Sequence, residues 1–336
     1  MKMNKTRQEL ADMFIGSLQE GKLPWRACWK ITVPENAVTH ARYRGINRLL
    51  LSYVAETRGY GDPRWCTYLQ AQKRGWQVQR GAKGVPVEYW ALYDPEAKKL
   101  LNWKDAAQIR RDDPDRYETL QLRYRISTVF NAEQIDGIPE LQNAPPLIAE
   151  EQIVAARDRL LQNMQLDYRE EGQEAYYNLK TDRVTLPPME RFDEGYAYFA
   201  TLLHECGHAS GHPNRLDRPF FTGDKSDYAR EELRAEIASS YTAQALGVEL
   251  PDELLTEHLD LHKAYIQNWL SVLKDNPDEL FAAIKDADKI SDYLLEKGEF
   301  TPERGNTPTP ELTAETAPCN SPAAVTPILQ EYEMEF

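Results

Sequence analysis

The stretch TLLHECGHASGH, residues 201–212, contains two histidines four positions apart, with a glutamate directly after the first. On an α-helix, residues i and i+4 lie on one face, so His204 and His208 can bind one metal ion through their imidazoles. Glu205 follows next round the turn, close enough to take a proton from a water molecule at that ion. Zinc fits these ligands best, although manganese or cobalt can occupy such sites. The stretch therefore predicts a zinc site on a helix, with a general base beside it.

The residues around this stretch favour a partly buried site. Phe199, Leu202 and Leu203 are apolar, which predicts that the helix is buried where the histidines emerge. Upstream, the segment RVTLPP, residues 183–188, alternates like a strand and ends at two prolines. Zinc peptidases of the zincin class place an edge strand beside the metal-binding helix, where it can pair with an extended peptide. We therefore expect residues 183–188 to form this edge strand.

A zincin needs a third protein ligand, and the segment EELRAE, residues 231–236, offers candidates. Glu232 and Glu236 stand four apart on one face of an expected helix. In gluzincins, the corresponding helix carries a ligand glutamate and, four residues on, an acid that supports a histidine. This pattern makes Glu232 the ligand and Glu236 the supporting acid. Three alternatives stay open, namely the reverse assignment, Glu231, and His212, which follows a helix-breaking glycine.

The charges are distributed unevenly along the chain. The 336 residues carry a net charge of −14, which by itself argues against binding to nucleic acid. Residues 1–90, however, contain 15 lysines and arginines against 7 acidic residues, and the remaining 246 residues contain 25 against 47. The basic first part predicts a surface that meets an anion.

Six of the seven tryptophans lie within residues 25–103, interleaved with arginines. Cations that neutralise phosphates, together with flat rings that stack on bases, suit single-stranded DNA, because duplex DNA hides the faces of its bases. Any one tryptophan is better explained as a core residue, whereas the region as a whole favours a binding surface. The residues expected to contact DNA are Trp25, Arg42, Tyr43, Arg44, Asn47, Arg48, Trp65, Arg80 and Lys83.

The alternation of patterns predicts a mixed α+β protein of two domains and a tail. Residues 1–145 are expected to form a small α+β domain, with helical segments over 4–20 and after residue 45, a hairpin over 77–94 and a returning strand over 122–135. Residues 146–299 are expected to form a mostly helical domain with a small sheet. Its predicted helices cover residues 150–164, 192–211, 226–247, 251–275 and 277–297. Residues 300–336 are acidic and rich in proline and threonine, which predicts disorder.

The composition favours a cytoplasmic protein. The first residues include no long apolar stretch with a cleavage site, so no secretory signal is expected. No apolar run approaches the ~20 residues of a membrane span, so no membrane partner is expected. The four cysteines fit neither metal-binding nor disulfide spacing, which is typical of a reducing compartment. They are Cys28, Cys66, Cys206 and Cys319.

Several stretches resemble a known family. GKLPWRACW, YRGINRLLL, YGDPRWCTYLQAQKRGWQVQRGAKGVPVEYW and VFNAEQIDG resemble the N-terminal domain of ArdC-type antirestriction proteins. LPPMERF, TLLHECGHASGHPNRLDR, YAREELRAEIASSY and HKAYIQNWLSVLKDN resemble the zincin-like metallopeptidase domain that follows it. The resemblance covers about residues 5–297 in the order of the family.

The resemblance implies a protein of conjugative plasmids, integrative elements or phages. Its first domain would bind single-stranded DNA, and the whole protein would protect incoming DNA from host restriction. Matched position by position, His204, Glu205 and His208 correspond to the metal motif of the family, and Glu232 and Glu236 to its acidic helix.

Three different functions are compatible with these sequence features. The first is a zinc peptidase that acts on a protein bound to single-stranded DNA. The second is a protein without enzymatic activity that coats single-stranded DNA and whose metal is structural. The third is a protein whose acidic body mimics DNA and binds a host restriction enzyme.

Overall fold

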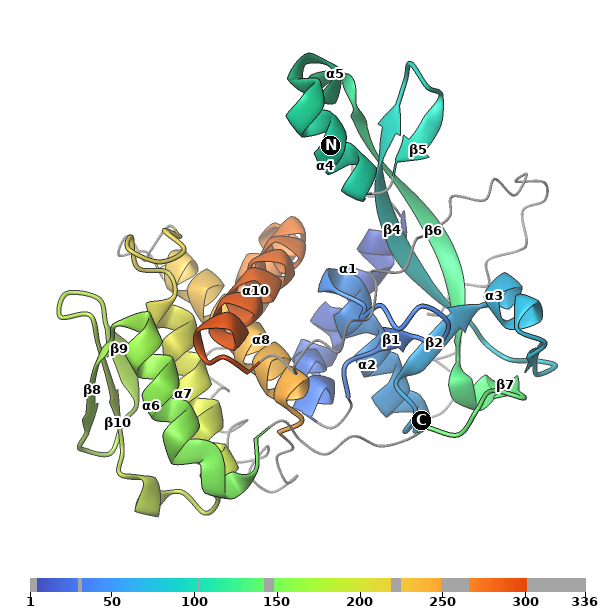
Figure 1. Cartoon of the computed structure of the whole chain (residues 1–336). Helices are drawn as coiled ribbons and strands as arrows, with labels where there is room; N and C mark the ends of the chain where they lie inside the picture. The colour runs from blue at the N-terminus through green and yellow to red at the C-terminus, as the bar shows by residue number, and fades with distance from the viewer. Residues whose placement is uncertain are drawn as a thin grey trace. The chain divides into compact units, whose positions relative to one another are not determined.

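The computed structural model describes residues 5–29, 32–101, 103–141, 148–218, 225–248 and 266–300. The predicted tail beyond residue 300 lies outside these ranges. Contacts divide the chain into two compact units (Figure 1). Unit 1 comprises residues Met1–Pro34, Arg42–Pro63 and Glu140–Arg304, and unit 2 comprises Glu35–Ala41 and Arg64–Pro139, together with residues beyond the described ranges.

Unit 1 is mostly helical because apolar residues recur at helical spacing along most of its segments. At Gly59, φ is 70°, and the amide of this glycine caps the helix before it. The elements are α1 (Lys5–Gln19), the 3-10 helix η1 (Pro24–Trp29), α2 (Gly45–Arg58), η3 (Glu150–Gln152), α6 (Ile153–Met164), η4 (Met189–Arg191), α7 (Gly195–Ala209), α8 (Lys225–Leu246), a helix over 266–275 and α10 (Asp278–Lys297). The predicted helices are confirmed, except that residues 251–265 lie outside the described ranges.

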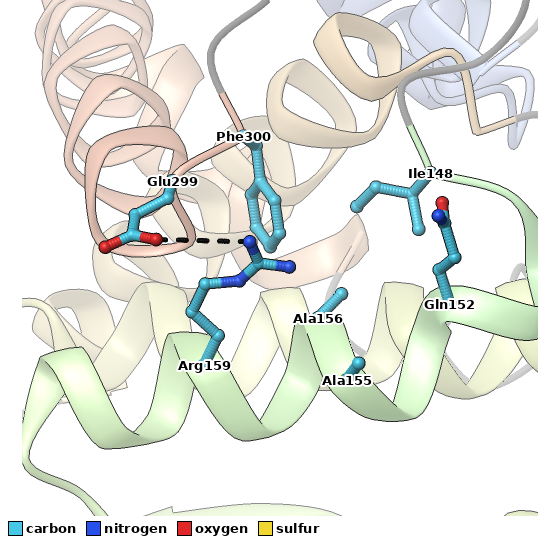
Figure 2. A pocket seen from close by; sticks show the side chains of 7 residues that line it. All are labelled: Ile148, Gln152, Ala155, Ala156, Arg159, Glu299 and Phe300. Carbon is cyan, nitrogen blue, oxygen red and sulfur yellow. Dashed lines mark ion pairs between the residues drawn. The ribbon is translucent and has the colours of Figure 1, made fainter.

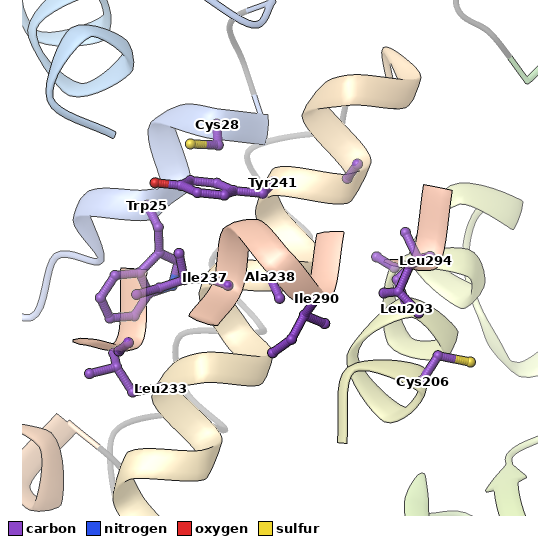
Figure 3. Packing of buried hydrophobic residues seen from close by; sticks show 14 of the residues in the cluster. Trp25, Cys28, Leu203, Cys206, Leu233, Ile237, Ala238, Tyr241, Ile290 and Leu294 are labelled. Atoms are coloured by element: carbon purple, nitrogen blue, oxygen red, sulfur yellow. The ribbon is translucent and has the colours of Figure 1, made fainter. Parts of the chain in front are cut away.

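One hydrophobic core holds unit 1 together and combines residues of α1, η1 and α2 with residues of α6, α7, α8 and α10. Trp25 of η1 packs edge-on against Trp269, with ring centroids 5.3 Å apart. Figure 3 shows Trp25 close to Ile237 of α8, with Ile290 of α10 and Leu203 of α7 further along the same core. Residues from the start of the chain therefore line the same interior as the metal-binding helix.

A three-stranded sheet of unit 1 has the order β8-β10-β9. β10 (Arg183–Leu186) is parallel to β8 (Asp167–Glu170) and antiparallel to β9 (Tyr176–Asn178). The predicted strand over residues 183–188 exists, but its expected position at the edge is wrong. β10 is central because its Val184, Thr185 and Leu186 are buried, and β9 is an edge strand instead.

Unit 2 is built on a five-stranded sheet with the order β1-β2-β6-β4-β5. β4 and β6 are long antiparallel strands that lie side by side in Figure 1, paired from Val85–Val129 to Tyr93–Gln121. The predicted returning strand over residues 122–135 is thereby confirmed. The elements are β1 (Glu35–Asn36), β2 (Arg64–Thr67), α3 (Tyr68–Lys73), β4 (Val85–Asp94), β5 (Lys99–Leu101), α4 (Trp103–Asp112), α5 (Pro114–Thr119), β6 (Gln121–Asn131) and the short η2 (Ala132–Gln134).

The predicted hairpin over residues 77–94 is wrong. β3 (Gln77–Val78) pairs with β7 (Ile135–Asp136), whereas β4 pairs with β5 and β6. Gly81 lies in a turn with φ of 83°, as expected, whereas Gly84 serves a different purpose. A Cβ atom on Gly84 would lie 2.3 Å from the Thr128 side chain, so glycine lets the start of β4 pass close to β6.

These elements confirm the mixed α+β class. The predicted division near residue 145 does not coincide with the compact units, because α1, η1 and α2 share the core of α8 and α10. The boundary near residue 145 therefore stays a prediction about the division of the sequence.

Within the described ranges, no helix has both the length and the apolar character needed to cross a membrane.

A pocket of about 300 Å³ lies between the start of α6 and the residues that follow α10 (Figure 2). An ion pair of 4.0 Å joins Arg159 and Glu299 on one side of it. None of the predicted site residues lines this pocket. Its lining consists of Ile148, Gln152, Ala155, Ala156, Arg159, Glu299 and Phe300.

Candidate metal centre

Helix α7 carries the two histidines on one face, as their spacing predicts. The Nε2 atoms of His204 and His208 lie 3.1 Å apart, and both side chains are largely buried. The buried residues Phe199, Leu202 and Leu203 anchor the helix in the core of unit 1. The imidazoles are therefore held with their Nε2 atoms facing one another.

Helix α8 brings a carboxylate to the same point. The Glu232 oxygens lie 3.6 Å from Nε2 of His204 and 3.4 Å from Nε2 of His208. Two ligand atoms that bind one zinc ion tetrahedrally, with bonds of about 2.0–2.2 Å, lie roughly 3.3–3.5 Å apart. The three ligand atoms therefore fit one divalent ion, and these residues also form a cluster suited to metal binding.

The charges at this point also favour a cation. Four buried carboxylates, those of Glu205, Glu231, Glu232 and Glu236, surround the two imidazoles. Burial favours the neutral form of His208, but hydrogen bonds to Glu231 and Glu232 outweigh this effect and raise its pKa to about 9. Burial likewise opposes ionisation of Glu232, yet its hydrogen bonds to both imidazoles hold its pKa well below the usual range. The donors therefore suit a positive charge at the point where they meet.

Glu236, which was predicted to support a ligand histidine, lies next to the first imidazole. Its Oε2 lies 3.3 Å from Nδ1 of His204, on the side of the ring away from the metal position. Its Oε1 accepts a hydrogen bond of 3.4 Å from Nε1 of Trp25. A carboxylate at this place orients the ring and makes Nε2 a better ligand.

Glu231 supports the second imidazole, a role that the sequence analysis did not assign to it. Its Oε1 lies 3.4 Å from Nδ1 of His208. Arg218 holds this carboxylate with two hydrogen bonds, of 2.8 and 3.1 Å. The sequence contains one signal for this contact, namely that Glu231 and Glu232 are adjacent. Two neighbouring carboxylates on a helix can contact two histidines that lie one turn apart. Arg218 lies in a segment without regular structure, where spacing gives no signal.

Glu205 is buried next to the two ligand histidines. Burial raises the pKa of its carboxyl, and the nearby imidazoles only partly oppose this effect. The backbone N–H of Tyr177, in β9, hydrogen-bonds to the Glu205 carboxylate. A buried carboxylate with a raised pKa, fixed by a strand, is suited to accept and return a proton.

Three of the residues expected to contact DNA lie in the interior. Trp25 and Trp65 are buried, and so is Arg48, whose guanidinium donates to Oε1 of Gln244 at 2.7 Å and stacks on the ring of Tyr241. Without an exposed face, these three side chains cannot touch DNA in this structure. This corrects the expectation, because the core of each unit needs large side chains more than the surface does.

The other six residues expected to contact DNA have exposed or half-buried side chains, and they belong to different units. Arg42, Tyr43, Arg44 and Asn47 belong to unit 1, at and before the start of α2, whereas Arg80 and Lys83 lie between β3 and β4 of unit 2. Arg44 is engaged by two acids of α10, Asp288 at 3.8 Å and Asp292. Arg42, Arg80 and Lys83 are exposed.

Comparison with known proteins agrees with this architecture. A family described as the N-terminal domain of the anti-restriction factor ArdC matches residues 4–130, and one described as a zincin-like metallopeptidase matches residues 155–286. The fold and the site thus define an ArdC-type N-terminal domain followed by a zincin-like metallopeptidase domain. The chain belongs to the ArdC family of antirestriction proteins.

Solved structures support this assignment. The metal-free crystal structure of the antirestriction protein ArdC from plasmid R388 is 31% identical, with a TM-score of 0.67, over 89% of this chain and 100% of that one. Its Mn(II)-bound structure is 32% identical, with a TM-score of 0.66, over 88% and 98%.

Among curated proteins, y4eC of Sinorhizobium fredii, an uncharacterised protein, is 33% identical over 85% of this chain and 90% of its own length. Two Escherichia coli proteins named DNA primase TraC are each 37% identical, over 86% and 85% of this chain. The chain spans only 27% and 19% of the length of these two TraC proteins.

Proposed function

We propose that this protein is a cytoplasmic, single-stranded DNA-binding antirestriction protein of a mobile element, such as a conjugative plasmid, or of a phage, and that its metal centre is a zinc-dependent peptidase site. One observation carries the enzymatic part. The Glu232 carboxylate lies within 3.6 Å of both imidazoles, and the buried Glu205 follows directly after the first of them. This arrangement supports a gluzincin-like ligand set, with Glu205 as the proposed general base.

His204, His208 and Glu232 would hold the ion. When bound, a zinc ion supplies Lewis acidity, which polarises a peptide carbonyl and makes water more acidic. Glu205 takes the proton of the attacking water and passes it to the departing amine, and its raised pKa suits both transfers. The N–H of Tyr177 keeps the carboxylate of Glu205 in position. Glu236 and Glu231 keep the two imidazoles oriented through their Nδ1 atoms.

The DNA-binding part is proposed for the exposed cations that remain from the sequence prediction. Arg80 and Lys83 flank the turn at Gly81, and both are exposed. Family membership and the basic first ninety residues support this assignment. The proposed partners are single-stranded DNA and either a protein bound to it or a host restriction enzyme as the peptidase substrate.

The Glu205→Gln variant tests the enzymatic part. The amide keeps the shape of the carboxyl group but cannot accept the proton, so zinc should remain bound while cleavage stops. The control is Glu190→Gln, at an exposed position in η4 before α7. Zinc content, proteolysis with single-stranded DNA present, and protection from restriction are measured for each. Protection that survives in Glu205→Gln would favour the alternative, a DNA-coating protein whose metal is structural.

A double variant, Arg80→Ala with Lys83→Ala, tests the DNA contact. Each lost phosphate contact lowers the slope of log K against log salt by about 0.7 on a single strand, so the slope should fall by about 1.4. The control is Lys98→Ala with Lys99→Ala, a second exposed pair in unit 2. An equal loss in both double variants would show only a general effect of charge.

A further inference from the structure

Among the described residues, the outer edge of β6 has no partner strand along most of its length. Within the described residues, β2 pairs only with Val129, Phe130 and Asn131 of this strand. β4 covers the other edge from Gln121 to Val129. Residues 121–126 are all exposed. An open edge leaves backbone N–H and C=O groups available, and natural proteins rarely leave a long apolar edge uncovered.

The side chains of this edge alternate between two kinds. Leu122, Tyr124 and Ile126 point to one face and have exposed fractions of 58%, 41% and 41%. Arg123 and Arg125 point to the other face and are exposed as well. Within the described part of the chain, neither guanidinium takes part in an ion pair, although Arg123 stacks on the ring of Tyr93.

The segment EYEMEF, residues 331–336 of the same chain, carries the complementary alternation. Tyr332, Met334 and Phe336 alternate with three glutamates, 331, 333 and 335. As a strand, it would present the apolar side chains to one face and the carboxylates to the other. Paired with β6 in a parallel or an antiparallel orientation, this segment would place its apolar side chains beside those of β6. Its glutamates would then lie beside Arg123 and Arg125.

We propose that residues 331–336 add a strand to the open edge of β6 within the same chain. Residues 301–330 connect them to Phe300, and an extended chain of that length spans up to roughly 100 Å. Backbone pairing would provide the binding energy. The apolar and the charged side chains would determine which side of the added strand points to each face of the sheet. The docked segment would neutralise Arg123 and Arg125.

The same edge fits single-stranded DNA less well. The rings and aliphatic side chains lie on one face of β6 and the two arginines on the opposite face. A nucleic acid strand on one face would contact only one of these two sets of β6 side chains, although Tyr89 and Tyr93 of β4 lie on the same face as the arginines. Only a strand at the edge reaches both faces at once and also satisfies the backbone groups.

Hydrogen exchange of the full chain, compared with a chain that lacks residues 331–336, tests the proposal. Docking should slow exchange of the amides of 121–128, so removal of the segment should speed it at least about fivefold, while the paired Val85–Tyr93 strand stays unchanged. The slower exchange should persist on dilution, because the contact lies within one chain. The proposal would be overturned if deletion of the segment left exchange of residues 121–128 unchanged, or if the protection disappeared on dilution. It would also be overturned if these amides were protected only after single-stranded DNA is added.

Charge exchange provides a second readout. The double variant Glu333→Lys with Glu335→Lys should lose the protection of the amides of residues 121–128. The control is Glu311→Lys with Glu315→Lys, which makes the same change of charge nearer the start of residues 300–336 and should keep the protection. Arg123→Glu with Arg125→Glu should lose it too, and the chain that combines this pair with Glu333→Lys and Glu335→Lys should regain it. Failure of the combined chain to regain protection, with its circular dichroism unchanged, would contradict the pairing.

Discussion

The indole Nε1 of Trp25 lies 3.4 Å from Oε1 of Glu236, although the two residues are 211 positions apart. Because Oε2 of Glu236 lies 3.3 Å from Nδ1 of His204, the indole stands directly behind the group that orients a ligand histidine. The region matched by the ArdC N-terminal family therefore contributes a side chain to the surroundings of the metal centre.

Trp25→Phe should weaken metal binding without unfolding the protein. The phenyl ring keeps most of the packing against Trp269 but removes the donor to Glu236, so the carboxylate is less well held. Loss of such a supporting hydrogen bond lowers metal affinity about 10-fold or more. Competition with a chelator measures the affinity. Trp76→Phe, at a half-buried tryptophan of unit 2, is the control, and equal affinities in the two variants would rule out the role given to Trp25.

Arg218→Ala should destabilise unit 1 strongly. It leaves the Glu231 carboxylate buried without the guanidinium that binds both of its oxygens. Breaking a buried ion pair from one side costs about 3–5 kcal/mol of the free energy of unfolding. In a Glu231→Gln background the same change should cost much less, because no buried charge remains. Urea unfolding of the four proteins of this cycle measures the coupling, and additive costs would disprove it.

Gly207→Ala should stabilise α7. A Cβ atom there would lie 3.5 Å from Cα of Ala235 in α8, which is an ordinary contact. Alanine in a helix interior is favoured over glycine by roughly 0.5–1 kcal/mol. Gly207→Leu, by contrast, should force α7 away from α8 and separate Glu232 from the histidines. Urea unfolding measures the first effect and zinc affinity the second; a destabilised alanine variant would contradict the contact distance.

Acid should weaken the β4–β5 region of unit 2 through Asp94. The backbone N–H of Ala97 and then the Arg116 side chain hold the pKa of this buried carboxyl below its ordinary value. The contribution to stability is therefore present above the unfolded value of about 3.9 and is lost as the pH falls below it through the lower pKa of the folded state. The difference in urea midpoint between wild type and Asp94→Asn should shrink from about pH 6 to about pH 3.

Asp115→Asn, at an exposed position in α5, is the control for this pH series. Its difference from wild type should stay small at every pH. If the Asp94→Asn difference were equally large at the acidic and the neutral end, the ionised carboxylate would not be the stabilising form.

The spacing of residues predicted the metal centre well because its main parts lie on two helices. The four-residue intervals from His204 to His208 and from Glu232 to Glu236 each fix one face, and the two faces meet. Arg218 and Trp25 could not be predicted in the same way. The first lies in a segment without periodicity, and the second reaches the site only through the packing of η1 on α8.

Strand pairing in unit 2 and the DNA-binding residues were harder to predict for a related reason. Alternation identifies a strand, but it does not say which strand will pair with it, so the sequence predicts a hairpin where β3 and β4 have different partners. The clustering of tryptophans and arginines in one sequence region likewise predicts a single surface, but three of the side chains expected on it are buried. Burial of Trp25, Arg48 and Trp65 depends on contacts with distant segments, which composition does not report.

The shared core of unit 1 has a consequence for the ancestry of such proteins. α1, η1 and α2 fall in the region matched by one family, yet they pack on helices matched by the other. A genetic crossover between the two matched regions would leave Trp269 facing a foreign neighbour and Glu236 without its indole. Natural selection should therefore discard such recombinants, and the two regions are expected to be inherited as one block, also when they are embedded in a much longer polypeptide.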